Sequence, residues 1–192
     1  MQMAFDAQPE LDDDTLIARF AGGDQSAARA LTHRLTPGVM ALARRMLRNE
    51  AEAEDVAQEA MLRLWKTAPK WEPGRAKAST WIYRVTSNLC TDRLRKKGTS
   101  NIDDIPEPID ETPSVTETMV ARERAAALNS VMHTLPDRQR EALHLRHFQE
   151  LSNIEIAKIM DTSIEAVESL LGRAKRNLAD KLLKQNDKLG LN

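Results

Sequence analysis

The sequence predicts an all-α protein in which a flexible acidic linker joins two small helical domains, the C-terminal one a helix-turn-helix. Ala, Leu, Arg and Glu dominate the 192 residues, aromatic residues make up only 4%, and β-branched runs are short. This composition favours helices over strands. Residues 98–116 hold three prolines and five acids without helical periodicity, which is typical of an extended linker. We therefore expect one domain over 1–97 and a second over 117–192.

Charge is distributed unevenly, although the formal net charge is only −1. Residues 1–100 sum to +3, residues 101–116 to −5 and residues 117–192 to +1. Such segregation indicates a nucleic-acid-binding face more clearly than the total does. No apolar run approaches the roughly 18 residues of a membrane span, and the N-terminal segment is acidic, unlike a signal peptide. With a single cysteine, Cys90, no internal disulfide can form, so we expect a cytoplasmic protein and inert packing at this thiol.

Three helices are expected before the acidic fourth helix, which begins near Asn49. The first spans 12–21 and ends at Gly22–Gly23, and the second spans 24–35 with its first residue as the N-cap. Thr36 and Pro37 have the order of an N-cap and a first helical residue, which predicts that a third helix begins there.

The fourth expected helix is amphipathic and has an acidic outer face. Asn49 and Glu52 resemble a capping box at its start, and its predicted buried stripe is Val56, Ala57, Ala60, Met61 and Leu64. The outer face holds Glu52, Glu54, Asp55, Gln58, Glu59 and Arg63. Acids near a helix N-terminus are mildly stabilising, which is one explanation of this face. A protein-binding surface is favoured over a catalytic carboxylate pair, because no His, Lys or metal ligand lies at useful spacing.

Residues 70–97 combine positive charge with aromatic rings. Eight Lys or Arg stand against two acids in this range, and all three Trp and the single Tyr of the chain lie between Trp65 and Tyr83. Cations attract a nucleic-acid backbone and rings can replace lost base stacking, so the patch suits a strand with unstacked bases. The alternative is a solvated helix face over an ordinary aromatic core.

A helix is expected within this basic stretch, with its N-cap at Ser79 or Thr80. The predicted buried stripe is Ile82, Val85 and Leu89. A different face carries groups able to bond phosphates or base edges, namely Arg84, Asn88, Asp92 and Arg95.

The second domain should open with a helix over 116–134 and continue with one that begins at Pro136. The first of these is expected to bury Val120, Leu128, Val131 and Met132. In the second, His144 and His147 have the spacing of half a metal site. Since no cysteine or carboxylate pair completes the site, surface histidines are expected instead.

The clearest motif follows, with the spacing of a helix-turn-helix. Ser152 and Glu155 form a capping box, Asp161 begins a tight turn that tolerates aspartate, and Thr162 with Glu165 resembles a second box. Ala157 is the small residue that lets the two helices approach closely, and Val167 and Leu170 are the apolar residues that anchor the second helix. In a major groove the bases would face Glu165, Glu168, Ser169, Gly172 and Arg173, and phosphates would face Lys175, Arg176, Lys181 and Lys184. An ordinary helical hairpin, the alternative, is disfavoured by the two caps, the anchors and the basic tail.

Four blocks, at 52–65, 78–95, 135–160 and 166–178, resemble the bacterial sigma factors of the small two-domain extracytoplasmic-function type in order and spacing. The resemblance implies an alternative sigma factor that is not an enzyme, carries no cofactor or metal, and is held inactive by a cognate anti-sigma factor. It implies that core RNA polymerase is bound through the β′ clamp helices and the β flap. It also implies that the acidic linker threads into polymerase channels normally used by RNA.

Residue roles also follow from the resemblance. It assigns contact with the clamp helices to Asp55, Gln58, Glu59 and Arg63. It assigns recognition and melting of the minus-ten promoter element to Lys77, Ser79, Trp81, Arg84, Asn88, Asp92 and Arg93, with Asn88 holding an extruded base. The minus-thirty-five element would be read by Glu165, Glu168, Ser169, Gly172, Arg173, Lys175 and Arg176. Glu168 stands where many relatives carry a basic residue and Gly172 replaces a bulkier one, so the preference of relatives for this element does not carry over.

Two other functions compete with this interpretation. A repressor or activator that binds duplex DNA alone would explain residues 135–184, but it gives no role to the Trp-rich basic stretch or the acidic helix. A small enzyme using the carboxylates of the fourth helix would need a metal or base that the sequence does not offer.

Overall fold

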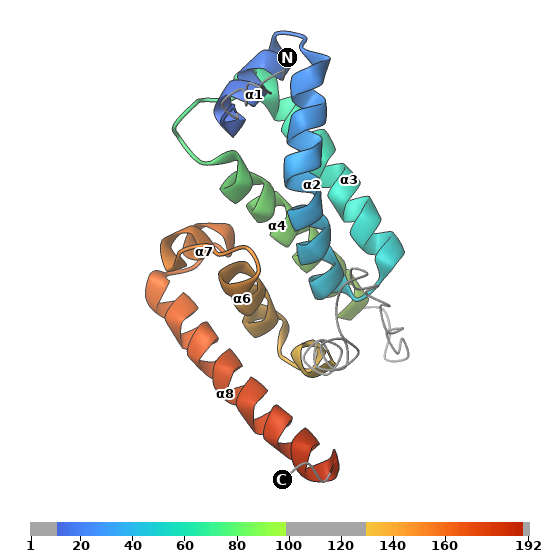
Figure 1. Cartoon of the computed structure of the whole chain (residues 1–192), viewed down its shortest axis with the longest axis vertical. Helices are drawn as coiled ribbons and strands as arrows, with labels where there is room; N and C mark the ends of the chain where they lie inside the picture. Colours follow the sequence, from blue (N-terminus) through green and yellow to red (C-terminus); the bar gives the residue numbers. More distant parts are fainter. Residues whose placement is uncertain (1–10, 99–129, 190–192) are drawn as a thin grey trace, which may run out of the picture.

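The computed structural model describes residues 11–98 and 130–189, and every regular element within these ranges is helical (Figure 1). The predicted all-α class is confirmed. A first helical group contains α1 (Asp13–Ala21), α2 (Gln25–Leu47), α3 (Glu50–Thr67), the short 3₁₀ helix η1 (Ala68–Lys70) and α4 (Ala78–Gly98). A second helical group contains α6 (Asp137–His147), α7 (Asn153–Ile159) and α8 (Ile164–Leu189). The predicted acidic linker, Val120 and Leu128 lie outside the described residues.

Helix starts follow the predicted caps at Asp24, Asn49 and Ser152, and Asp12, expected as the first residue of its helix, is the cap of α1. Asp12 accepts from the Thr15 backbone N–H at 2.8 Å, and Asp24 accepts from that of Ser26 at 2.8 Å. Asn49 accepts from the Glu52 N–H at 2.9 Å at the start of α3. Ser152 and Glu155 form the complete capping box of α7. Each cap satisfies backbone donors that the first helical turn leaves without partners.

The predicted break at Thr36 and Pro37 is wrong, because α2 runs unbroken through both residues. A proline inside a helix costs about 3 kcal/mol. One apolar stripe nevertheless continues across it, and each buried aliphatic side chain contributes about 1.5–3 kcal/mol, so burial outweighs the proline. The stripe consists of Leu31, Leu35, Val39, Leu42 and Met46, all at most 4% exposed.

The start and the buried face of α4 also differ from expectation. The helix begins at Ala78, ahead of Ser79 and Thr80, and the Lys77 carbonyl accepts from the Trp81 N–H at 3.0 Å. Instead of the stripe at Ile82, Val85 and Leu89, the buried residues are Ala78, Thr80, Ile82, Tyr83, Thr86, Ser87 and Cys90. Tyr83 and Ser87 are buried where the second helical group covers α4, since they bond to Gln149 and Glu141, and the sequence pattern does not show this contact.

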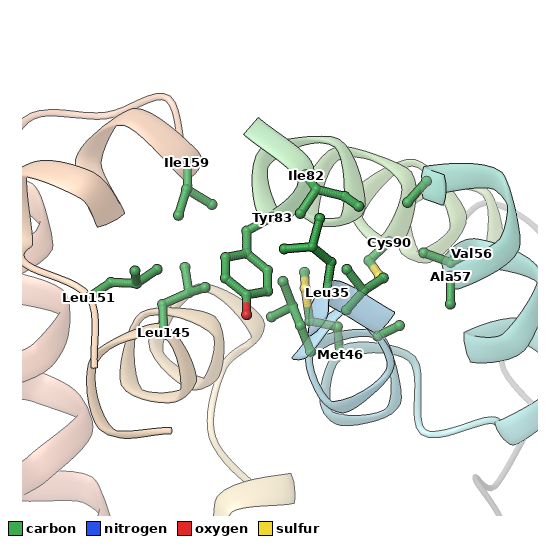
Figure 2. Packing of buried hydrophobic residues seen from close by; sticks show 14 of the residues in the cluster. Leu35, Met46, Val56, Ala57, Ile82, Tyr83, Cys90, Leu145, Leu151 and Ile159 are labelled. Carbon is green, nitrogen blue, oxygen red and sulfur yellow. The ribbon is translucent and has the colours of Figure 1, made fainter. Parts of the chain in front are cut away.

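Buried side chains of both groups form one continuous cluster. The second group packs against the first where α6 meets α2 and where α7 meets α4. Figure 2 shows Tyr83 at this junction, with Leu145 and Leu151 on one side and Leu35 on the other. Helix α8 packs on α6 and α7. Among the helices of residues 11–98 and 130–189, none combines the length and the apolar character of a membrane span.

A buried arginine ties the two groups together at the ends of α2 and α6. Arg140 is 1% exposed, and its guanidinium donates to the carbonyls of Leu135 at 3.0 Å and Met46 at 3.3 Å. It also pairs with Asp137 at 2.6 Å. A buried cation needs such partners because desolvation would otherwise be costly. This role is not predictable from the sequence, since Arg140 looks like an ordinary helix-surface residue.

Candidate nucleic-acid interface

A groove of about 470 Å³ lies between α3 and α4. Its walls are Asp55, Gln58, Glu59, Leu62 and Arg63 from α3 and Leu89, Asp92, Arg93 and Lys96 from α4. The structure therefore brings together all four side chains predicted to contact a partner protein. It also adds two residues that the sequence analysis assigned to DNA, Asp92 and Arg93.

Ion pairs hold the polar side chains of this groove in place. Arg63 Nε donates to Glu59 Oε1 at 2.8 Å one turn along α3, and this hydrogen bond lowers the pKa of Glu59. Arg93 lies 3.6 Å from Asp55 and donates to the Glu52 carbonyl at 3.0 Å. Beside these charges, Leu62 exposes 43% of its surface. An apolar side chain ringed by charged ones is the arrangement found at the centre and rim of protein interfaces.

The residues predicted to read the minus-ten element divide into separate surroundings along α4. Asn88 is exposed, while Ser79 and Trp81 are half-buried near the start of the helix. Asp92 accepts from Arg95 at 2.8 Å beside the groove just described. Lys77 and Arg84 instead face the second helical group. The predicted set therefore spans two faces of α4.

The aromatic residues of the basic stretch pack mainly within the fold. Trp65 lies against Phe20 with ring centroids 4.7 Å apart, and Tyr83 is only 8% exposed. Trp71 and Trp81 form an edge-to-face pair with centroids 5.9 Å apart, and both remain half-buried. Trp71 and Trp81 therefore have partly exposed rings near the start of α4.

Asp14 fixes the loop that carries Trp71 toward α4. Its carboxylate accepts from the Trp71 indole N–H at 2.8 Å and from the Gly74 backbone N–H at 2.9 Å. Gly74 has φ of 78°, a left-handed conformation that glycine adopts without strain. Sequence reasoning missed Asp14 because nearly sixty residues separate it from its partners.

The second helical group supplies the helix-turn-helix as predicted, with α7 and α8 joined by a tight turn. Asp161 has φ of 49°, which confirms the expected left-handed turn. Ala157 and Val167 are buried at the helix crossing, whereas Leu170 is half-buried. The cap of α8 is Ser163, whose Oγ accepts from the Ala166 N–H at 3.2 Å, so the box predicted at Thr162 is wrong.

The predicted base-reading and phosphate-facing residues lie on the uncovered side of α8. Gly172 is half-buried, and the exposed residues are Glu165, Glu168, Ser169, Arg173, Lys175 and Arg176. Arg173 donates to Ser169 Oγ at 2.8 Å. Lys181 is turned away and donates to the Thr134 carbonyl at 3.1 Å.

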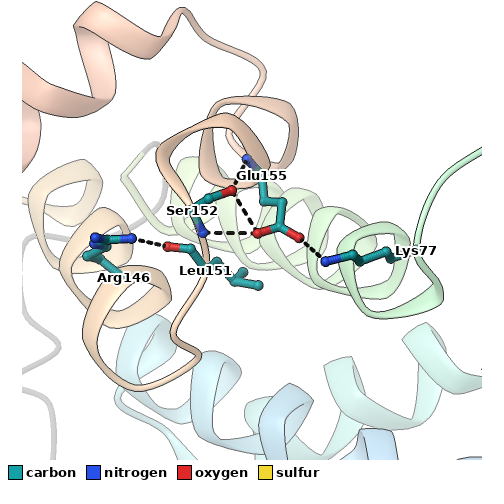
Figure 3. Close-up of polar contacts among 5 residues, drawn as sticks. All are labelled: Lys77, Arg146, Leu151, Ser152 and Glu155. Carbon is teal, nitrogen blue, oxygen red and sulfur yellow. Dashed lines mark hydrogen bonds and ion pairs between the residues drawn. The ribbon is translucent and has the colours of Figure 1, made fainter.

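Acidic side chains of the second group pair with the cations of α4 at the junction. Lys77 lies 2.8 Å from Glu155, and Arg84 lies 3.5 Å from Asp161. Glu155 thus has two tasks, since its other oxygen accepts from Ser152 in the capping box (Figure 3). Hydrogen bonds from Lys77 and Ser152 lower the pKa of Glu155 to about 2, and the same ion pair raises the pKa of Lys77.

Uncharged and buried polar groups complete the junction. Tyr83 Oη donates to Gln149 Oε1, and Ser87 Oγ donates to Glu141 Oε1. Burial raises the pKa of Glu141, which is only 2% exposed. Burial also raises the pKa of the Cys90 thiol to about 12, which agrees with inert packing. Neither Glu141 nor Gln149 is predictable as a contact residue, because nothing along the chain marks contacts between separate domains.

His144 corrects another expectation. It is 1% exposed rather than on the surface, whereas its neighbour His147 is exposed as predicted. Its ring stacks on Phe148 with centroids 5.3 Å apart. Within residues 11–98 and 130–189, no group of three His, Cys, Asp or Glu is placed to hold a metal ion.

Comparison with known proteins agrees with the geometry in both halves. Residues 31–99 match the family model for sigma-70 region 2, and residues 125–178 match that for sigma-70 region 4. The chain is 30% identical over 177 residues to the ECF RNA polymerase sigma factor SigW of Bacillus subtilis, covering 86% of this chain and 94% of the relative. It is also 30% identical over 183 residues to SigE of Mycolicibacterium smegmatis, another ECF RNA polymerase sigma factor, covering 91% and 70%.

Two solved structures share the fold of this chain. CnrH in complex with the cytosolic domain of CnrY superposes with a TM-score of 0.67 at 25% identity, covering 88% of this chain and 96% of that one. The sigma factor RpoE of Bartonella quintana, solved with the anti-sigma factor NepR, gives a TM-score of 0.69 at 22% identity over 81% and 96%.

Proposed function

The chain belongs to the extracytoplasmic-function sigma factors of the sigma-70 family, and from this membership we propose that it binds core RNA polymerase and directs it to specific promoters. The observation that carries the proposal is that one chain combines a match to sigma-70 region 2 with a helix-turn-helix matching region 4. A repressor that binds duplex DNA alone would need only the second part. As proposed domains, 1–97 and 117–192 are joined by the acidic linker 98–116.

The groove between α3 and α4 is the proposed seat of the polymerase β′ clamp helices. Asp55, Gln58, Glu59 and Arg63 would supply the polar contacts. The exposed Leu62 beside them supports a protein partner, because interfaces bury apolar area inside a polar rim. The second domain would contact the β flap.

The outer face of α4 is proposed to recognise and melt the minus-ten element. Lys77, Arg84 and Arg93 would attract phosphates, and Trp81 would offer a ring to an unstacked base. Ser79, Asn88 and Asp92 provide hydrogen-bonding groups for base edges, with Asn88 holding the extruded base. The exposure of Asn88 supports its role, since a flipped base needs an accessible partner.

Helix α8 is proposed to read the minus-thirty-five element in the major groove through Glu165, Glu168, Ser169, Gly172, Arg173, Lys175 and Arg176. Glutamate accepts hydrogen bonds from the cytosine amino group. Two exposed glutamates at the start of α8 therefore favour a site with cytosines facing that end of the helix.

The remaining proposals concern regulation and chemistry. We propose that a cognate anti-sigma factor holds the chain inactive; the sigma factor RpoE, which has a similar fold, was solved in complex with the anti-sigma factor NepR. The chain would have no catalytic role of its own, since the polymerase makes each phosphodiester bond. It would act in the cytoplasm, where polymerase meets the chromosome.

Run-off transcription tests the proposal. Purified core polymerase is incubated with pooled fragments of the host genome, with and without this protein. We expect new defined transcripts that appear only when both proteins are present, and their start sites would reveal the promoter sequence. Binding of duplex DNA by the protein alone, with no new start sites, would favour the repressor instead.

A further inference from the structure

The loop between η1 and α4 leads directly into the proposed minus-ten contacts. It spans residues 71–77 and runs past α1 (Figure 1). Trp71 begins the loop and Lys77 ends it, one residue before α4 starts. Residues 72–77 are all exposed, so the segment gains little stability from burial. Polar contacts and backbone geometry therefore set its shape.

Residues 72–75 form a tight turn. The Arg75 backbone N–H donates to the Glu72 carbonyl at 3.3 Å, three residues back. Pro73 and Gly74 occupy the two central positions, and Gly74 has φ of 78°. Proline at the first centre and a left-handed glycine at the second are typical of a type II turn. The side chains of Glu72 and Arg75 also pair at 2.9 Å, but both are exposed, and exposed pairs hold weakly.

Asp14 of α1 holds this turn at two points. Its Oδ1 accepts from the Trp71 indole N–H at 2.8 Å, and its Oδ2 accepts from the Gly74 backbone N–H at 2.9 Å. Each carboxylate oxygen therefore binds one donor, the first just before the turn and the second within it. Hydrogen bonds to an ionised carboxylate are roughly twice as strong as those between neutral groups. A single side chain of α1 thus fixes the turn relative to the first helical group.

The same carboxylate also fixes the orientation of the Trp71 ring. The indole N–H is the one donor of a tryptophan side chain, and its bond to Asp14 restricts rotation of the ring. Held in this way, Trp71 meets Trp81 edge to face, with centroids 5.9 Å apart and ring planes at 83°. Both rings are half-buried, so part of each stays open to a ligand. Trp81 is the ring proposed to take an unstacked base of the minus-ten strand.

Rings that are ordered before DNA arrives favour capture of an unstacked strand. Immobilising one flexible side chain on binding weakens affinity by about 2–12-fold, and Asp14 has already immobilised Trp71 in the free chain. Direct contact between Asp14 and the strand is disfavoured, because a carboxylate repels phosphates. The geometry therefore favours an action of Asp14 through the two tryptophans.

We propose that Asp14 is a positioning residue for capture of the minus-ten strand: it holds the 72–75 turn and the Trp71 ring so that Trp71 and Trp81 present a fixed aromatic corner to an unstacked base. The proposal rests on the proposed function for its ligand, the minus-ten strand. It gives α1 a part in promoter opening, although this helix carries none of the proposed DNA contacts.

The contact can be tested on the full chain without polymerase or DNA. Because the chain has three Trp, labelling tryptophan with ¹⁵N gives three indole N–H signals in nuclear magnetic resonance, and Trp71→Phe identifies the signal of Trp71. We expect Asp14→Ala to shift this signal and to speed its hydrogen exchange with water. Asp13→Ala is the matched control, because Asp13 lies in the same first turn of α1 but pairs with Arg34 at 2.7 Å. It should leave the signal in place.

The effect on promoter opening is measured with core polymerase and each variant, on a promoter found by run-off transcription. We expect Asp14→Ala to reduce opening about 2–12-fold in permanganate reactivity, with unchanged affinity of the closed complex in gel shifts. Asp13→Ala should match the unmodified chain in both steps. Asp14→Asn keeps one acceptor oxygen for the two donors, so its loss of opening should be smaller, and it carries the test if Asp14→Ala does not fold. Circular dichroism and urea unfolding establish that each variant is folded.

A double-mutant cycle separates positioning from a general loss of stability. In a Trp71→Phe chain, which keeps an aromatic ring but lacks the N–H donor, Asp14→Ala should reduce opening less than it does alone. An unchanged indole signal, normal opening by Asp14→Ala, equal loss of the closed complex and of opening, or additive effects in the cycle would overturn the proposal. If Trp81→Ala opens the promoter normally, the assignment of this ring to the minus-ten strand is refuted instead, and the indole signal still decides whether Asp14 holds the loop.

Discussion

The burial of His144 predicts a specific loss of stability in mild acid. Burial, together with nearby Arg45, lowers the pKa of His144 from its ordinary value to about 3. In the unfolded chain an exposed histidine titrates near 6.5. The stabilisation from the neutral ring is therefore present above pH 6.5 and is lost as the pH falls, because the unfolded chain takes up a proton that the folded chain refuses. Between pH 7 and pH 5 this linkage costs about 2 kcal/mol, or roughly 4–8 °C in melting temperature for a chain of this size.

The measurement compares thermal and urea unfolding at pH 7 and pH 5 for the unmodified chain and for His144→Gln, which keeps a polar side chain beside Gln149 without a titrating ring. Glu141 acts in the opposite direction, because burial raises its pKa: its contribution is present below its ordinary value of 4.5 and is lost as pH rises. This carboxyl group is present in both proteins, so its effect cancels in the comparison. His147→Gln, an exposed histidine on the same helix, is the control. If His144→Gln loses as much stability as the unmodified chain between the two pH values, the reasoning is refuted.

Three further predictions follow from the groove, α4 and the core. Gln58→Ala combined with Glu59→Ala should weaken binding to core polymerase while leaving the melting curve unchanged, with Glu54→Ala as a control outside the groove; normal affinity in a titration with labelled polymerase would contradict the assignment. Asn88→Ala should impair promoter opening more than closed-complex formation, and equal loss of both steps in permanganate and gel-shift assays would count against base capture. Leu64→Ala, at a side chain that is fully buried, should cost about 2–5 kcal/mol in urea unfolding, and a change below about 1 kcal/mol would show that the α3 stripe is less tightly packed than described.

Local patterns were enough to predict most of the first helical group. All five residues predicted for the buried stripe of α3 are buried, because the 3.6-residue period of apolar side chains is undisturbed along that helix. The prediction of a break at Pro37 was wrong, because the buried apolar stripe of α2 continues on both sides of the proline and outweighs its local preference for a helix start. The α4 stripe failed for a related reason: Ser87 looks like a surface residue, yet it is buried and bonds to Glu141 of a second packing partner, α6.

The candidate site was predictable where all its residues lie on one or two adjacent helices. Asp55, Gln58, Glu59 and Arg63 share a face of α3, so helical spacing alone brings them together. The roles of Glu141, Gln149 and Asp14 depend on contacts between segments more than fifty residues apart. Such contacts leave no periodic trace in a single sequence. His144 was misjudged because its helix carries polar residues on every side, and tertiary packing rather than local pattern decides which of them are buried.

We propose that this chain directs polymerase to promoters by binding two promoter elements with its two helical groups. Footprinting on one promoter from the run-off experiment, with nuclease protection and permanganate reactivity measured together, tests it most directly. We predict protection around the minus-thirty-five element and reactive, unpaired thymines at the minus-ten element only when core polymerase and this protein are both present. Protection by the protein alone without unpaired thymines, or melting by polymerase without the protein, would contradict the account.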